Sequence, residues 1–224
     1  MRDAAVIAEP ATREISWTEA NRACLEAELA RLRLLLHRRV LWLRRLWKHD
    51  PLQAWQGLVI SDQQADSLLA GDDPEAEACF YREDPAAAAV DRALGDTATH
   101  AAGLRHALRD AGSPPAVDLL AEMLGLSPFE REVLLLALAP EIDPAFERLY
   151  AYVQDDAARK EATSHLALAL YGRLEGAGRE AFQPQAPLRR LCLIAVEPGA
   201  PGAGAARPFH LDERTANYLQ GVNR

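Results

Sequence analysis

Few residues of this chain have the types and spacing that chemistry on a bound substrate requires. A phosphate-binding loop needs the pattern G-x-x-x-x-G-K-[ST], because its backbone N–H groups cradle the phosphates while the lysine and the hydroxyl serve phosphate and Mg²⁺. The glycine-rich stretch from Pro198 to Gly204 contains no lysine, serine or threonine, and its two prolines lack backbone N–H donors. We therefore predict a loop between two strands here, and no nucleotide site.

The histidines, carboxylates and cysteines also lack the spacing that a metal site or a catalytic site requires. His100 and His106 are the closest pair of histidines, and their spacing of six does not put two metal ligands on one helical face. The aspartate pairs at 72–73 and 155–156 fall at expected helix ends or turns, where carboxylates cap helices or face solvent. The three cysteines are far apart, which is typical of core residues in a reducing compartment. The sequence thus predicts no catalytic residue, metal site or cofactor in this chain, and a binding module rather than an enzyme.

Composition narrows the class of protein further. The chain of 224 residues is 49% hydrophobic but only 6% aromatic, which is typical of helices packed on helices. Its net charge of −8 disfavours nucleic acid as a partner, because phosphates repel an acidic surface. The sequence shows no signal peptide and no apolar run near the ~18 residues of a membrane span, so we expect a cytoplasmic protein with no membrane partner.

A long helix is expected after a flexible tail at residues 1–15. Ser16 and Glu19 fit a capping box, and leucines then recur at a spacing near 3.5, which predicts a coiled-coil-like seam reaching about Lys48. Such a helix is roughly 45–50 Å long, which is too long for a compact core unless part of it projects or pairs.

Charge is polarised along this helix. Acidic residues lie in its first half, and the second half carries only bases: Arg31, Arg33, Arg38, Arg39, Arg44, Arg45 and Lys48. One interpretation is a solvated face that complements the helix dipole. The other is a docking strip, helped by Trp42 and Trp47, for an acidic protein surface in preference to nucleic acid. On the second interpretation, the candidate partner-binding residues are the basic Arg38, Arg39, Arg44 and Arg45 and the acidic Glu147, Asp155 and Asp156 of a later helix.

The rest of the first 112 residues is expected to be mostly helical. The pattern indicates an extended stretch at 55–60, a helix at 61–69, and a helix at 85–111 that Gly95 and Gly103 weaken and could split. The run from Gly112 to Pro115 is the best domain boundary. We therefore divide the chain into a tail (1–15), a helical N-terminal region (16–112) and a second domain (113–224).

The second domain is expected to be helical with one β-hairpin. Helices are predicted at 115–124, at 127–139 before Pro140, at 143–154 with Asp143 as N-cap, and at 164–174. Apolar stretches at 188–196 and 207–211 flank the loop 197–206 and predict a hairpin, and Asp212 caps a last helix. Helices followed by a hairpin follow the winged-helix plan. The predicted fold class is therefore mainly α, a helical N-terminal region with a long coiled-coil-like helix plus a winged-helix-like domain.

Three segments carry a resemblance to a known family: LGLSPFEREVLLLALAPEIDPAFERLYAYVQDD (124–156), LRRLCLI (188–194) and RPFHLDERTANYLQG (207–221). They resemble the winged-helix-like N-terminal domain that precedes the ATPase core in a bacterial family of AAA-type ATPases, which includes ATPases encoded with extracellular contractile injection systems. GLVISDQQADSLLA (57–70) is similar to the N-terminal region of the same family. The resemblance implies a recruitment region ahead of a hexamer-forming core that holds ATP and Mg²⁺. No catalytic residue of that core can be carried onto this chain.

The sequence therefore predicts a non-catalytic recruitment or regulatory domain of an AAA-type ATPase. It would bind a protein partner or client, acting in assembly of, or cargo loading into, a contractile injection particle. A DNA-binding winged-helix regulator is an alternative, but ten acids face four bases from Asp118 to Glu161, a balance that would repel phosphate. A coiled-coil adaptor that dimerises through the first helix is a third possibility.

Overall fold

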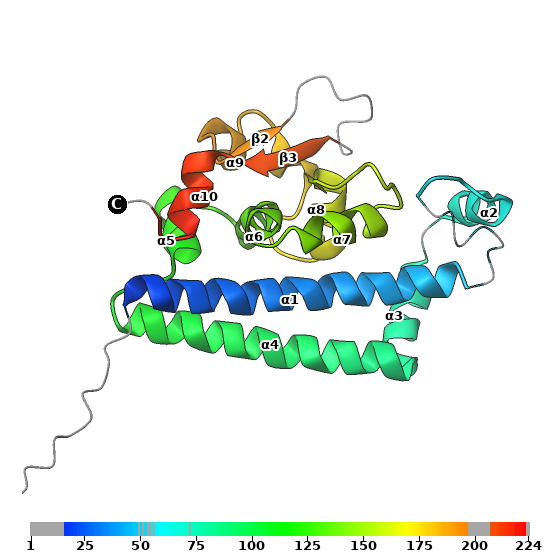
Figure 1. Ribbon diagram of the computed structural model, residues 1–224, viewed down its shortest axis with the longest axis horizontal. Coiled ribbons are helices and arrows are strands. Elements are labelled where there is room, and N and C mark those ends of the chain that lie inside the picture. Colours follow the sequence, from blue (N-terminus) through cyan, green and yellow to red (C-terminus); the bar gives the residue numbers. More distant parts are fainter. Residues whose placement is uncertain are drawn as a thin grey trace, which may run out of the picture.

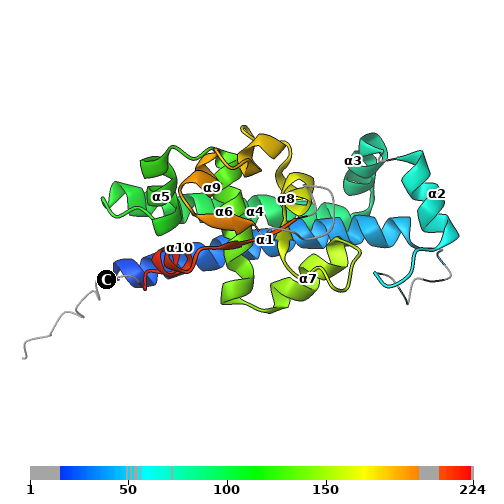
Figure 2. The same cartoon turned by 90° about the horizontal axis from the view of Figure 1, so that it is seen from above.

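The computed structural model describes residues 16–48, 50, 52, 55, 57–71, 73–196 and 207–222. Its frame is an antiparallel pair of long helices, α1 (Trp17–Leu46) and α4 (Pro85–Asp110), which lie side by side (Figure 1). α2 (Asp62–Ala70) lies beyond the end of α1, and α3 (Pro74–Glu83) packs beside the last turns of α1 and leads into α4. The second domain packs on the side of α1 opposite to α4. Figure 2 shows α2 and α3 at and beyond the edge of the second domain.

The leucine seam of α1 is buried within the chain. The Ser16 hydroxyl accepts the Glu19 backbone N–H at 3.3 Å and the Glu19 carboxylate accepts the Ser16 N–H at 3.0 Å, which confirms the predicted capping box. The seam positions 25, 29, 32, 36 and 43 are each no more than 7% exposed, because α4 covers one side and the second domain the other. A coiled-coil dimer through this seam would require the core to open.

The connection between the long helices differs from the sequence prediction. No strand forms in the described part of 55–60, where Trp55 and Gly57 lie in tight turns. α3 was not predicted, although its N-cap Asp73 accepts the backbone N–H groups of residues 75 and 76 at 3.1 and 2.9 Å. α4 runs unbroken through Gly95 and Gly103, since packing against α1 outweighs the modest cost of glycine in a helix.

α6 (Pro128–Ile142) is the central helix of the second domain. Every residue from Phe129 to Ala139 is buried, and Ser127 caps the start of the helix in a capping box with Glu130. Around it lie α5 (Ala116–Leu124), α7 (Ala145–Val153), α8 (Ser164–Tyr171) and α10 (Glu213–Leu219), of which α8 is shorter than predicted.

The predicted end of α6 before Pro140 is wrong, because the helix continues for three further residues, to Ile142. A proline inside a helix removes the hydrogen bond to the carbonyl four residues earlier, which here belongs to Leu136. The buried Tyr150 hydroxyl donates to that carbonyl at 2.7 Å and satisfies it. α7 then begins at Ala145 rather than directly after Asp143, whose carboxylate accepts the Ala145 N–H at 2.9 Å.

A small antiparallel sheet completes the winged-helix fold. β2 (Ile194–Val196) and β3 (Pro208–Leu211) form the predicted hairpin, and β1 (Ala162–Thr163), which was not predicted, pairs with the other edge of β3. The strand expected from 188 is shorter because α9 (Pro187–Arg190) and a turn with Cys192 at φ 55° occupy its first half. The expected loop 197–206 and tail 1–15 lie outside the described residues.

A buried network of charges joins the long helices to the second domain. Arg131 of α6 is 8% exposed and donates to Glu28 of α1 and Asp118 of α5, each at 2.7 Å. Arg31 of α1 donates to Glu28 at 2.9 Å and also pairs with Glu132 of α6. Burial alone would raise the pKa of Glu28, but Arg131 and Arg31 hold it below its ordinary value. The hydrophobic core also runs continuously from α1 to α10, so the division at 112–115 stays a prediction.

We expect Arg131→Ala to destabilise the fold by about 3–5 kcal/mol, because two buried carboxylates would lose their shared counter-ion. Urea unfolding followed by circular dichroism measures this loss. Arg22→Ala is the matched control, since Arg22 pairs with Glu26 on the exposed face of the same helix and should change stability little. Equal effects of the two substitutions would contradict a structural role for the network.

Candidate protein-interaction surfaces

The basic strip predicted on α1 is divided by pairing within the chain. Arg38 donates to Asp91 of α4 at 2.7 Å and lies over the Tyr81 ring at 3.5 Å from its centroid. Arg39 donates to Glu77 of α3 at 3.3 Å. These two arginines therefore fasten α3 and α4 to α1 and are only partly exposed.

Arg44 and Arg45 lie at the exposed end of the strip. No hydrogen bond or ion pair is found for either within the part of the chain that the structure describes. The tryptophans expected to support binding contact rings of the chain itself: the half-buried Trp42 packs on Phe80 at 5.6 Å and the buried Trp47 on Tyr152 at 5.7 Å between ring centroids. Partner binding by the four arginines stays a prediction, with Arg44 and Arg45 free to make it.

The three acidic candidates do not form one helical face. Glu147 is half-buried in the first turn of α7, whereas Asp155 and Asp156 lie in the turn after the helix ends at Val153. Asp156 accepts the Ala158 N–H at 3.0 Å. Their part in partner binding also stays a prediction.

Asp155 instead connects the second domain to α2. It has φ 51°, and its carboxylate accepts the Gln64 side-chain amide at 3.1 Å. Partial burial raises the pKa of the Asp155 carboxyl, a hydrogen bond with the backbone of Gly57 lowers it, and the nearby carboxylates of Asp156 and Asp50 raise it. The net shift is upward, so the carboxyl is less acidic than usual where it meets α2.

The surface formed by residues 57–71, hereafter the tip, was not predicted from the sequence as a site. It is held to the body by polar contacts: besides the Gln64 bond, the Ser61 hydroxyl donates to Asp50 and the Ala157 N–H donates to the Gly57 carbonyl at 3.4 Å. Gly57 has φ 74°, and a Cβ there would lie 3.1 Å from the backbone nitrogen of Ala157. A side chain at 57 would therefore push the tip from the body.

Exposed hydrophobic side chains gather in the tip. Five described positions stand out by their exposed fractions: Leu58 69%, Val59 47%, Ile60 72%, Leu68 74% and Leu69 86%. In α2 the buried position is a glutamine, Gln64, rather than a leucine. A patch of this kind marks an interaction site in a folded protein. The sequence offered only the pair Leu68-Leu69 near the end of a short expected helix, which does not by itself reveal their exposure.

The helix at the position of a DNA-recognition helix is very short. In helix-turn-helix folds the second helix of a pair enters the major groove. Between β1 and β2 that pair is α8 followed by a 3₁₀ turn (Arg179–Phe182) and α9, which has four residues. By its place before β2 in the strand order, α9 occupies the recognition position, whereas α7 lies before β1. Arg189 there donates to the Phe182 carbonyl at 3.2 Å, whereas Arg173, Arg179 and Arg190 are exposed.

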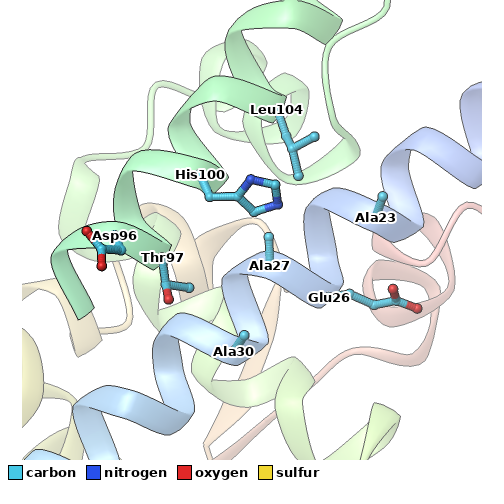
Figure 3. Close-up of a pocket in the computed structure, with 8 residues that line it drawn as sticks. All are labelled: Ala23, Glu26, Ala27, Ala30, Asp96, Thr97, His100 and Leu104. Atoms are coloured by element: carbon cyan, nitrogen blue, oxygen red, sulfur yellow. The ribbon is translucent and has the colours of Figure 1, made fainter. Parts of the chain in front are cut away.

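An open groove of about 620 Å³ runs between α1 and α4 (Figure 3). Its lining on α1 is mainly alanine, at positions 23, 27 and 30, and His100 of α4 points toward these methyl groups, whereas Glu26 points away. The groove has the small side chains that admit a neighbouring helix, but no nucleophile beside a base.

Metal and thiol chemistry find little support in the described part of the chain. No group of three or more His, Cys, Asp or Glu side chains there is placed to hold a metal ion. Cys24 is buried as predicted, but the prediction of a core position is wrong for Cys192, which is exposed, and for Cys79, which is half-buried. All three are free thiols, and burial raises the pKa of Cys24, which disfavours the reactive thiolate. No described helix is long and apolar enough to cross a membrane.

We expect Arg38→Ala to lower the free energy of unfolding by about 1–2 kcal/mol, because it removes an ion pair and a cation–π contact together. Arg44→Ala, which removes an exposed arginine of the same helix, should leave stability unchanged. Thermal unfolding of both variants measures the difference. Equal melting temperatures for Arg38→Ala and the unsubstituted protein would show that the contacts of Arg38 do not stabilise the fold.

Comparison with known proteins identifies the family of this fold. The family model described as "Winged helix domain, variant" matches residues 19–224, from the first turn of α1 to the end of the chain. No curated protein and no solved structure matches the chain. The match spans the long helical pair as well as the sheet, so both parts belong to the family's unit. The chain therefore belongs to the variant winged helix domain family.

Proposed function

We propose that this chain is a non-catalytic protein-interaction domain that recruits a partner or client to a AAA-type ATPase core on the same polypeptide. The observation that carries the proposal is the tip, whose large apolar side chains are exposed on a helix held to the body by polar contacts. Surfaces of this kind are covered by another macromolecule when the protein works. The docking of a partner there would be separate from the chemistry, which the core would supply.

The finer part of the proposal rests on the resemblance of residues 124–156, 188–194 and 207–221 to the N-terminal domains of AAA-type ATPases. By that resemblance the parent protein is hexameric, binds ATP and Mg²⁺ in its core, and works in the cytoplasm. Its task would be assembly of a contractile injection particle or the loading of cargo into one.

DNA binding is the second candidate, favoured by the exposed Arg173, Arg179 and Arg190 around the recognition position. Against it stand the single helical turn of α9 and the ten acids between Asp118 and Glu161. A helix of one turn cannot lie along the major groove and present several side chains to base edges.

A DNA titration separates the two candidates. We expect no binding of duplex DNA tighter than ~100 µM at low salt, because the acidic surface repels phosphate. Fluorescence anisotropy of a labelled duplex is the measurement, and Arg179→Ala/Arg190→Ala is the matched variant. Binding that falls steeply with salt and is lost in this variant would favour the DNA-binding regulator instead.

The ATPase connection is tested by reading the source gene past codon 224. We expect a G-x-x-x-x-G-K-[ST] motif downstream in the same reading frame, because an ATPase core needs a phosphate-binding loop. A stop codon directly after Arg224 would contradict this part of the proposal. It would leave a free-standing interaction protein.

A further inference from the structure

We infer that the tip docks a basic amphipathic helix from a separate partner protein. This inference rests on the proposed function, and it names the chemistry of the partner and the side chains that receive it. Three features of the structure carry it: the apolar stripe of α2, the charge around that stripe, and the place of the tip in the fold.

The apolar stripe of α2 faces away from the body. Ala65, Leu68 and Leu69 follow the spacing i, i+3, i+4, which places them on one side of the helix. A surface helix ordinarily buries such a stripe and leaves its polar side to solvent. α2 buries Gln64 alone and leaves Leu68 and Leu69 74% and 86% exposed, alongside the polar Asp62, Asp66 and Ser67. An apolar stripe next to Leu58 and Ile60 fits the anchoring residues of a helix laid across it.

The segment that carries the stripe has charge of one sign, although Arg148 and Lys160 of the second domain lie near Gly57 at its inner side. From Asp50 to Tyr81 the sequence contains seven acidic residues and no lysine, arginine or histidine. Of the acids, Asp62, Asp66, Asp73 and Glu75 are exposed. Such a rim repels an acidic partner and attracts a helix whose apolar face is bordered by lysine or arginine.

The described part of the chain does not offer such a helix near the tip. The last described turn lies at the opposite end of α1, where Asn21 donates to the Leu219 carbonyl at 2.9 Å. α1 has thirty residues, so this end lies about 45 Å from the tip. In a second copy, the basic half of α1 has its apolar side, including Leu36 and Leu43, buried in its own core. We therefore take a separate protein as the source of the helix, since neither the described part of this chain nor a second copy of that part offers one.

Designed peptides test the inference on the full chain. The probe is a fluorescent peptide of ~18 residues with leucine at i, i+3, i+4 and i+7 and lysine elsewhere, and its counterpart has glutamate in place of lysine. We expect the Leu/Lys peptide to bind at low salt and the Leu/Glu peptide not to bind. Leu68→Ser/Leu69→Ser should weaken the first by roughly tenfold or more without changing the net charge.

Matched variants make the outcome specific. Met123→Ser removes an apolar side chain that is 70% exposed on α5, and it should bind the Leu/Lys peptide like the unsubstituted protein. Asp66→Asn should weaken binding and reduce its dependence on salt. Circular dichroism melting checks that each variant is folded, which the exposure of the changed side chains favours.

Two results would overturn the inference. One is equal binding of the Leu/Lys peptide to the protein and to Leu68→Ser/Leu69→Ser, which would reduce the interaction to attraction between net charges. The other is a dimer in light scattering that the same double substitution dissolves, because the tip would then serve a second copy. Neither result bears on the DNA titration, so failure of the inference and failure of the proposed function are distinguishable.

Discussion

The buried ion network around Arg131 is the constraint on which the rest of the structure depends. Its guanidinium satisfies Glu28 of α1 and Asp118 of α5 together, and Arg31 returns a second bridge from α1 to Glu132 beside it. Charges in such surroundings must meet their partners with good geometry or destabilise the fold. Leucine packing could tolerate small shifts of α1 along α6, whereas this network fixes one register and so the place of everything attached to α1.

Because its register is fixed, the long helical pair holds the tip at a fixed place relative to the second domain. α1 lies against the second domain as far as Trp47, which packs on Tyr152 of α7, and α2 extends past the edge of that domain (Figure 2). Arg38 and Arg39 stiffen this end by tying α4 and α3 to α1. The tip is thus presented at a set distance from α10, as an interaction surface needs if binding is to be relayed to a neighbouring domain.

The domain has the sheet of a winged helix, but the helix at the position that reads DNA in other helix-turn-helix folds, α9, has only four residues. The order β1-β3-β2 and the central α6 are held by buried side chains, and α9 fills the recognition position with a single turn. A fold of this kind supports several functions, so function has to be argued from its surfaces. Here the apolar surface lies outside the sheet domain, on an element that the helical pair holds.

Local signals in the sequence determined much of the fold. The capping boxes at Ser16, Ser61 and Ser127 marked helix starts correctly, because a cap depends on residues within one turn. The spacing of leucines in α1 and the hairpin around residues 197–206 were readable for the same reason.

Only the tertiary structure decided what the charges do. The basic half of α1 looked unpaired because its acids, Asp91, Glu77 and Glu132, lie on other helices far along the chain. Pro140 looked like a helix end because its compensating donor, Tyr150, comes from the next helix. The exposure of Leu68 and Leu69 was likewise hidden, since burial depends on which elements cover a helix and not on its own residues.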